Sequence, residues 1–396
     1  MRLEAGTDLD FLSALVHGRR SRLAEGSRLD ELCRLRTVAE LGQEIAPRVS
    51  TPARTGRHQA GRAETVTDLQ RRMVADLAAE LATLADRLGG DRGARVVEWL
   101  GARFQAENIK VLARGLATGK PLAELQALII PLKKPFAIDV PGLAGSDSVE
   151  AFIRRVPSEP LRDGLLAAAP VYDRNRASFF LEAGLDRGYL AELLHRVGRV
   201  RGGEGLKALA YQETDMFHLA LAARGRLLYG LQAEDLALFH VEGAKVSPGV
   251  FRAMLAAPDA GELALLAAKR VIDLPQAPKP GTGNREQGTG KEASGSRFPV
   301  PGSRFPVPRR FAGAEAREAL TPAILETLAL SRFHRLADRI FRRTPVGLDA
   351  VAAYVALARI ELANLITLSE GIRAAAAPEA IRRRLIPRQA TGASGV

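Results

Sequence analysis

The stretch ENIKVLARG (107–115) occurs in this chain in two further versions, FHLALAARG (217–225) and ANLITLSEG (363–371). Each version has Asn or His at its second position, an acid or amide three residues before that position, and Gly at its end. A recurring pattern reports a recurring supersecondary unit, so it says more about the fold than local propensity does. The positions that define the pattern are Gln105, Asn108, Gly115, Asp215, His218, Gly225, Glu361, Asn364 and Gly371.

The spacing of the three versions supports an internal repeat. Asn108 and His218 are 110 residues apart, and His218 and Asn364 are 146 residues apart. The second interval contains a Pro/Gly-rich stretch, 275–310, with the tandem duplication GSRFPVPGSRFPVP. About 110 residues remain when this stretch of roughly 36 is set aside. We expect 275–310 to be an inserted, disordered linker.

The segments after the three versions also correspond. They read PLAELQALIIP (121–131), LQAEDLALFHVEG (231–243) and PEAIRRRLIP (378–387). The shared plan is a long helix, a break and a short helix, which Pro opens in two cases, as suits the first helical turn. Ala and Leu dominate the composition and strand signals are few, so we predict an all-α fold.

The composition is that of a globular protein, with 46% hydrophobic residues. The single cysteine, Cys33, excludes an intramolecular disulfide and a Cys-based zinc site. No signal-peptide pattern opens the chain, and no run of eighteen apolar residues predicts a membrane span. The most apolar segment, 348–368, contains Asp349, Arg359 and Glu361, so we expect a buried core helix there.

The formal net charge is +12, which two hypotheses explain. The basic residues either cover solvated helix faces or attract a polyanion: acidic partner subunits, anionic lipid headgroups or nucleic acid. They are scattered and few aromatics interleave with them, which argues against a nucleic-acid groove. A basic helical-repeat protein that binds nucleic acid remains an alternative, as does an all-α enzyme with an unrecognised site.

No pattern of catalytic or ligand-binding residues appears. The six histidines have no HxxxH or HExxH spacing, so the sequence predicts no metal. GxSxG is absent, and GTGNREQGTGK (281–291) departs from a phosphate-binding loop at Arg285 and Glu292. We expect no catalytic site, no cofactor and no small-molecule substrate.

Two roles remain open for the polar residues of the recurring pattern. Positions i and i+3 are neighbours on a helix face, so each version carries a polar pair beside an apolar stripe. Either the pair locks the helix end by hydrogen bonds, or it lines a shared surface around a pseudo-three-fold axis. A further helix is predicted to begin at a capping box formed by Thr67 and Gln70. The same helix is predicted to end at Gly89 and Gly90.

The order of these segments resembles one family, the C subunit of V/A-type ATP synthases, whose eukaryotic counterpart is the V-ATPase d subunit. The resemblance covers nearly the whole chain except 275–310. It is carried by 10–45, FQAENIKVLARG (104–115), LDRGYLAELL (185–194), ETDMFHLALAARGRLLYG (213–230), 346–372 and 378–387. Gln105, His218 and Glu370 depart from the acid, the Asn and the basic residue that the family pattern has at these places.

The resemblance implies a funnel-shaped array of three similar helical subdomains, which we place at 1–133, 134–274 and 311–396. It further implies a non-catalytic central-stalk subunit that couples the rotor shaft to the membrane proteolipid ring of a rotary ATPase. Such a protein would be peripheral, on the cytoplasmic face of the membrane. The nine positions of the pattern would then be structural or interface residues.

Overall fold

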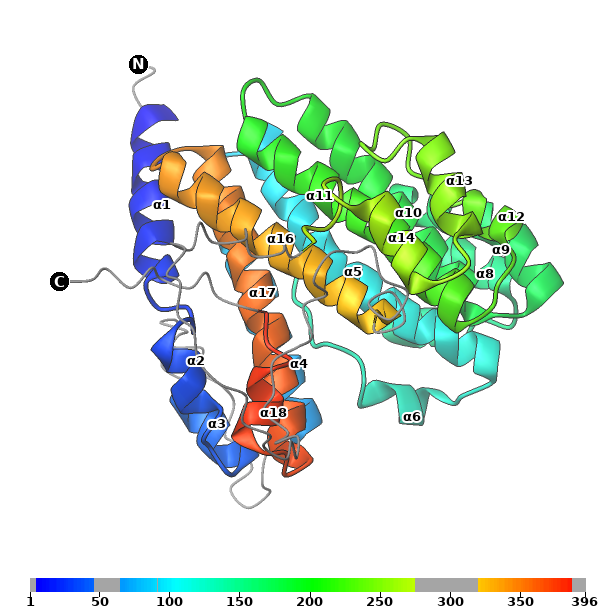
Figure 1. Cartoon of the computed structure of the whole chain (residues 1–396), viewed down its shortest axis with the longest axis horizontal. Helices are drawn as coiled ribbons and strands as arrows, with labels where there is room; N and C mark the ends of the chain where they lie inside the picture. Colours follow the sequence, from blue (N-terminus) through cyan, green and yellow to red (C-terminus); the bar gives the residue numbers. More distant parts are fainter. Residues whose placement is uncertain (1–4, 46–64, 91, 275–319, 387–396) are drawn as a thin grey trace, which may run out of the picture.

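The computed structural model of the chain describes residues 5–45, 65–90, 92–274 and 320–386 (Figure 1). Within these ranges the chain is all-α, as the sequence predicts, and no β-strand is formed. Pairing of the β type is limited there to an isolated bridge between Ala268 and Ile272. The expected linker 275–310 lies outside the described residues, as do 46–64 and 387–396.

Three pairs of long helices form hairpins. The first joins α4 (Val66–Arg87) to α5 (Arg92–Thr118), the second joins α10 (Ser178–Gly198) to α11 (Glu204–Ala220), and the third joins α16 (Pro322–Arg343) to α17 (Leu348–Arg373). Each turn contains glycine in the left-handed conformation, which glycine adopts without steric cost. These glycines are Gly89 and Gly90, Gly202 and Gly203, and Gly347.

The three hairpins close into a ring. Helix α5 packs against α10, α11 packs against α16, and α17 packs back against α4. The interior is filled by side chains, with a cavity of about 10 Å³ between α5, α10, α11, α16 and α17. Figure 1 shows α17 leaving the end that holds the turns in a different direction from α5 and α11. The helices therefore diverge from the hairpin turns.

Shorter helices complete the fold around this ring. An N-terminal group consists of α1 (Ala5–Arg20), α2 (Ser27–Leu32) and α3 (Val38–Ile45), of which α1 and α3 pack against α17. The helices between the hairpins are α6 (Leu122–Gln126), α7 (Val140–Ala144), α8 (Val149–Arg155), α9 (Glu159–Asn175), η2 (Leu221–Leu228), α12 (Ala233–Ala237), α13 (Pro248–Ala256) and α14 (Ala260–Ala267). The last described helix is α18 (Pro378–Arg382).

The predicted capping box at the start of α4 is wrong by two residues. Thr65, not Thr67, is the N-cap, and its side chain exchanges hydrogen bonds with the backbone and carboxylate of Asp68. The sequence TVTDLQ offers two overlapping frames, and an acid serves the box at Thr65 as the amide would at Thr67. Gln70 is used elsewhere: its amide donates to Ser369 and Glu370 of α17.

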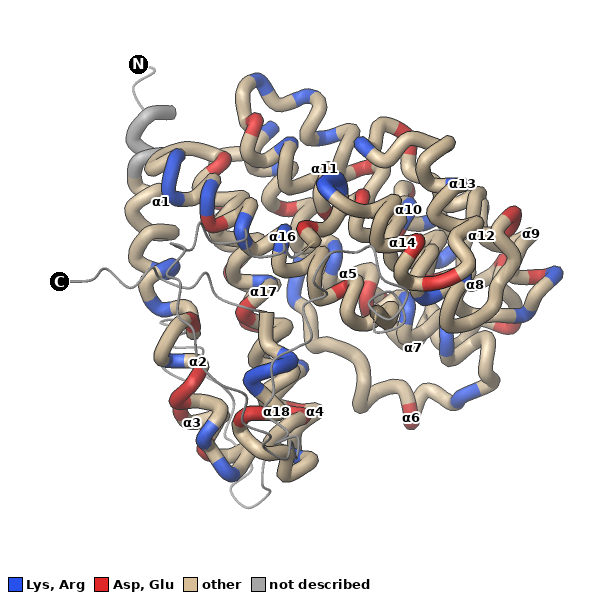
Figure 2. The backbone as a smooth tube through the Cα atoms, viewed as in Figure 1, with Lys and Arg blue, Asp and Glu red and all other residues tan. Residues whose placement is uncertain are grey.

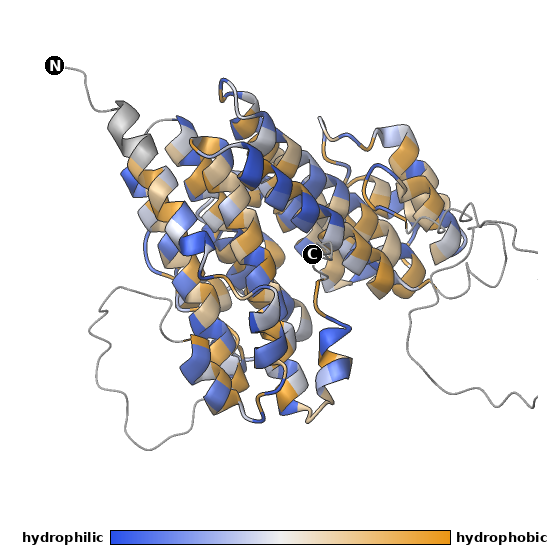
Figure 3. Cartoon of the chain, turned by 60° about the vertical axis from the view of Figure 1, so that its left-hand side comes forward, coloured by the Kyte–Doolittle hydropathy of each residue, from blue (hydrophilic) through white to orange (hydrophobic). Residues whose placement is uncertain are grey.

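Two apolar clusters hold the molecule together. The larger runs through all three hairpins. The smaller joins the N-terminal group to the end of the described chain, with Leu29, Cys33 and Leu41 packed among Leu368 and Ile381. Figure 3 shows hydrophobic and hydrophilic positions interleaved along the helices, as expected of helices with one buried side. The two ends of the chain therefore share one core.

Helix α17 is a core helix. By length and composition alone it could cross a membrane, as no other helix could in the part of the chain that the structure describes. However, 72% of its most apolar window is buried inside the fold. This burial agrees with the interpretation of 348–368 as a core helix and explains its apolar composition.

Candidate functional site

In the first copy of the recurring pattern, Asn108 holds the chain that follows α6. Its side-chain amide donates to the carbonyl of Ile130 at 2.9 Å and accepts from the N–H of Ile130 at 2.8 Å. Gln105, one helical turn earlier, donates to the carbonyl of Phe136 at 3.5 Å. Both side chains are buried, and these bonds pair their polar atoms with backbone groups of the following segment.

In the second copy, His218 and Asp215 make the corresponding contacts. Nε2 of His218 accepts from the N–H of Val241 at 3.0 Å, and the carboxylate of Asp215 accepts from the N–H of Val246 at 2.9 Å. Both side chains are buried. Burial, and then the stacked ring of His240 at 4.7 Å, lowers the pKa of His218 to about 3. Its imidazole is therefore neutral, as an accepting Nε2 requires.

In the third copy, Asn364 accepts from the N–H of Ile386 at 2.9 Å, which lies 22 residues on, as Ile130 lies from Asn108. Glu361 takes a partner from the other end of the chain: its carboxylate accepts from the N–H of Ala24. The partners of Gln105 and Asp215 lie 31 residues downstream. The position 31 residues after Glu361 is outside the described residues, and Ala24 is a partner of Glu361 within them.

The partners share a place in the fold. Val246 directly precedes Ser247, the N-cap of α13, and Phe136 precedes Asp139, the N-cap of α7. Ala24 precedes Gly26, the N-cap of α2. Each first polar residue therefore holds the backbone just ahead of a helix. For the third copy that helix belongs to the N-terminal group.

The three glycines let the short helices approach the long ones. A Cβ atom built on Gly115 would lie 2.3 Å from Leu125 of α6. A Cβ on Gly225 would lie 2.9 Å from Leu236 of α12, and one on Gly371 would lie 2.6 Å from Ile381 of α18. Real Cβ contacts are longer than 3.0 Å, so any larger residue at these positions would force the facing Leu or Ile side chain to shift. The pattern is thus a helix-end clamp, made three times.

The second copy contains one extra residue, and a π-helix absorbs it. Each pattern glycine faces a Leu or Ile of the short helix that follows it. This residue comes ten positions after the glycine in the first and third copies and eleven positions after it in the second. The extra residue falls where α11 continues as η2. A π-helical stretch has a wider turn, so it lengthens a helix by one residue without rotating the residues beyond it. The contacts of Gly225 are preserved in this way.

Sequence reasoning missed a second set of equivalent residues, two positions before each first polar residue. These are Arg103, Glu213 and Arg359, and they meet inside the ring. The guanidinium of Arg359 makes two hydrogen bonds to the carboxylate of Glu213, at 2.9 and 2.7 Å. A charge at the same position of every copy, beside an apolar stripe, was a signal that could have found them.

The electrostatics of this central cluster are balanced within it. Burial alone would raise the pKa of Glu213, but Arg359 and Arg103 bring it below its ordinary value. Arg103 in turn lies 3.3 Å from Asp186 of α10, which Lys110 contacts at 2.7 Å. Because each charge has an opposite neighbour, the cluster ties α5, α10, α11 and α17 together.

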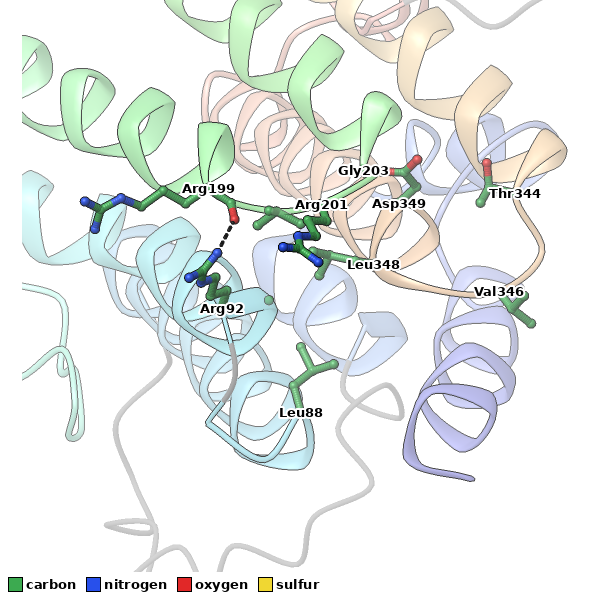
Figure 4. Close-up of a pocket in the computed structure, with 11 residues that line it drawn as sticks. Leu88, Arg92, Arg199, Arg201, Gly203, Thr344, Val346, Leu348 and Asp349 are labelled. Carbon is green, nitrogen blue, oxygen red and sulfur yellow. Dashed lines mark hydrogen bonds between the residues drawn. The ribbon is translucent and has the colours of Figure 1, made fainter. Parts of the chain in front are cut away.

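At the opposite end of the ring, the three hairpin turns surround a hollow (Figure 4). Its volume is about 550 Å³. Arg92 of α5 donates to the carbonyl of Arg199 at 3.1 Å across this hollow, joining the first two turns. Asp349 at the start of α17 accepts from the N–H groups of Gly205 and Leu206 at 3.0 and 2.8 Å. A second hollow of about 620 Å³ adjoins it, also lined by Arg92 and Arg199.

No arrangement suited to a metal ion occurs among the residues that the structure describes, since no three His, Cys, Asp or Glu side chains gather there. Cys33 is buried in the smaller apolar cluster. Figure 2 shows Lys and Arg spread over most helices rather than confined to one stripe. In the described part of the chain, the notable polar features are therefore the hydrogen bonds that hold helices together and the basic residues on the surface.

Comparison with known proteins gives one family. Residues 12–271 match the family model described as "ATP synthase (C/AC39) subunit", which is about two thirds of the chain. The match begins in α1 and ends just before the stretch at 275–310. No curated protein matches the chain.

Proposed function

Because the chain belongs to the ATP synthase (C/AC39) subunit family, and so to the subunits of a V/A-type rotary ATPase, we propose that it is a non-catalytic central-stalk subunit. It couples the rotor shaft to the membrane proteolipid ring, and its partners are the subunits of both. It lies as a peripheral protein on the cytoplasmic face of the membrane.

The observation that carries this proposal is the ring of hairpins locked at both ends. A part that transmits torque must resist twisting, and close-packed helices deform little. In this chain the three hairpins pack in a closed circle. The pairs Asn108–Ile130, His218–Val241 and Asn364–Ile386 fix each long helix to the chain that follows the next short helix. Stiffness and three-part symmetry suit a rotating adapter.

We further propose that the three copies mark three subdomains around a pseudo-three-fold axis. Their equivalence rests on matched contacts, at 22 or 23 residues and at 31 residues downstream. In this arrangement the diverging helix ends form the rim that receives the shaft, and the end with the hairpin turns faces the ring.

The proposal is tested in the assembled complex. A purified rotary ATPase without this subunit is expected to hydrolyse ATP without pumping ions, and adding the chain back is expected to restore pumping. The measurements are ATP turnover and ion uptake into proteoliposomes. A complex that pumps at full efficiency without this chain would exclude the coupling role.

A further inference from the structure

The two hollows at the hairpin-turn end form a basic surface, which we call the turn-end face. The hollow of about 620 Å³ is lined by Arg92, Arg95, Glu192, His195, Arg196 and Arg199. The adjoining hollow adds Arg201. Together they gather five arginines and one histidine from α5, α10 and the turn after α10, against two carboxylates, those of Glu192 and Asp349.

Four of these arginines have no acidic partner among the described residues; one of them, Arg92, is held by the carbonyl of Arg199. Glu192 is already paired, because Nε of Arg196 lies 2.7 Å from its carboxylate. Asp349 is engaged by the backbone of α11. Among the described residues, no carboxylate lies within ion-pair distance of Arg95, Arg199 or Arg201, and all three are exposed. The turn-end face therefore carries net positive charge that the fold leaves uncompensated.

Apolar side chains adjoin these arginines. Figure 4 shows Leu88 and Leu348 at the same hollow as Arg92 and Arg201, with Val346 on the α16–α17 turn. Val346 is 52% exposed, so its apolar side chain is open to a partner at this face. Its neighbour Gly347 donates to the hydroxyl of Ser13, and Phe11, two residues earlier in α1, is 53% exposed.

We propose that the turn-end face binds anionic phospholipid at the membrane surface. Guanidinium groups match phosphate geometry and donate two hydrogen bonds at once. Exposed Val and Phe beside arginines suit the boundary between headgroups and acyl chains. A free phosphate would use the arginines but leave Val346 and Phe11 in water, and an acidic protein loop would also gain nothing from them. Charge and apolar exposure together therefore favour lipid.

This inference rests on the proposed place of the chain at the membrane side of a rotary ATPase. It is tested on the isolated full-length chain, so that its failure is separate from failure of the coupling role. Co-flotation is measured with vesicles of pure phosphatidylcholine and with vesicles that contain phosphatidylglycerol. The chain is expected to bind the second and not the first, and added salt is expected to weaken binding.

Two triple variants of equal charge change locate the site. Arg95→Gln/Arg199→Gln/Arg201→Gln removes three of the arginines without an acidic partner, and Arg252→Gln/Arg383→Gln/Arg384→Gln removes exposed arginines from α13 and the α18 end. Each arginine near an anionic surface strengthens binding by about five-fold, so the first variant is expected to weaken it by on the order of 100-fold. The second is expected to change it far less. Thermal unfolding confirms that both variants fold.

The remaining arms distinguish the sources of the anion. Val346→Ser is expected to weaken vesicle binding at high salt, where the apolar contact dominates. Millimolar inorganic phosphate and soluble polyglutamate are both expected to leave vesicle binding largely intact. Equal loss in the two triple variants, no effect of Val346→Ser, or full competition by phosphate or by polyglutamate would each overturn the assignment to lipid.

Discussion

The carboxylate of Glu361 accepts a hydrogen bond from the backbone N–H of Ala24, 337 residues away in the chain. This contact takes the place that Phe136 and Val246 fill for the first two copies. The N-terminal group is therefore tied to the helix that carries the third copy of the pattern. Residues that are far apart in the chain are thus in direct contact in the fold.

Removing this contact is expected to destabilise the whole fold. In Glu361→Ala the buried N–H of Ala24 loses its acceptor, which costs about 1–3 kcal/mol. The free energy of unfolding is measured by urea titration. Glu242→Ala, at an exposed position in the turn between α12 and α13, serves as the control and is expected to change stability by less than about 0.5 kcal/mol. Equal stability of the two variants would mean that the N-terminal group is not held through Glu361.

Glycine-to-alanine substitution is expected to have opposite effects on stability at Gly115, a pattern glycine, and at Gly18, which lies outside the pattern. Gly115→Ala places a methyl group against Leu125 and is expected to cost about 1–3 kcal/mol. Leu125→Ala in the same chain relieves the clash, so the combined loss is expected to be smaller than the sum. Gly18→Ala in α1, with open space around it, is expected to stabilise by up to about 1 kcal/mol. The free energy of unfolding is measured for the original chain, Gly115→Ala, Leu125→Ala, the double variant and Gly18→Ala.

His218 and Asp215 predict a compensated response to acid. The pKa of His218 is lowered from 6.5 to about 3, so its contribution to stability is present above pH 6.5 and is lost as pH falls toward 3. Burial raises the pKa of Asp215 from 3.8 to about 6, so its contribution is present below pH 3.8 and is lost as pH rises through 6. Between about pH 4 and 6 the two nearly cancel.

Replacing one partner removes this compensation. In Asp215→Asn the amide oxygen can still accept from Val246, while the stability relative to the original chain is expected to fall by up to about 1.4 kcal/mol per pH unit between pH 6 and 4. In His218→Asn the opposite slope is expected, because only Asp215 titrates. Urea unfolding at pH 4, 5, 6 and 7 measures both. Parallel pH profiles in all three chains would contradict the assignment.

In the central cluster, replacing both Arg359 and Glu213 is expected to destabilise the fold less than replacing Arg359 alone. Arg359→Leu leaves the buried carboxylate of Glu213 without its bidentate partner and is expected to cost about 3–5 kcal/mol. Adding Glu213→Leu removes the stranded charge, so the double variant is expected to be the more stable of the two. A double-mutant cycle in the free energy of unfolding gives the coupling. Simple additivity would show that the pair contributes no specific interaction.

The stretch 275–310 is predicted to be dispensable for folding. A long insertion adds little to the entropic cost of closing the chain, so its deletion is expected to leave the unfolding temperature nearly unchanged. Assembly into the complex is expected to persist. Calorimetry and co-purification with partner subunits measure the two effects, and a large drop in the unfolding temperature would contradict a disordered linker.

Part of the fold was predictable because it depends on local order. Helical periodicity predicted α4 and α17, and the left-handed glycines at Gly89 and Gly90 were expected to end α4. The capping frame at Thr65 was missed because two frames overlap in six residues. The recurring pattern located all three clamps, but periodicity says nothing about a partner 22 or 31 residues away.

The sequence by itself determined the all-α class, the recurrence of the clamp and the residues that form it, because these follow from spacing along one helix. Only the tertiary structure decided what each residue holds. It brought Ala24 to Glu361, gathered Arg103, Glu213 and Arg359 inside the ring, and placed Val346 at the same hollow as Arg201 and Arg199. Such contacts arise when the hairpins close on one another, and the burial of shared apolar surface, rather than any local preference, fixes which side chains meet.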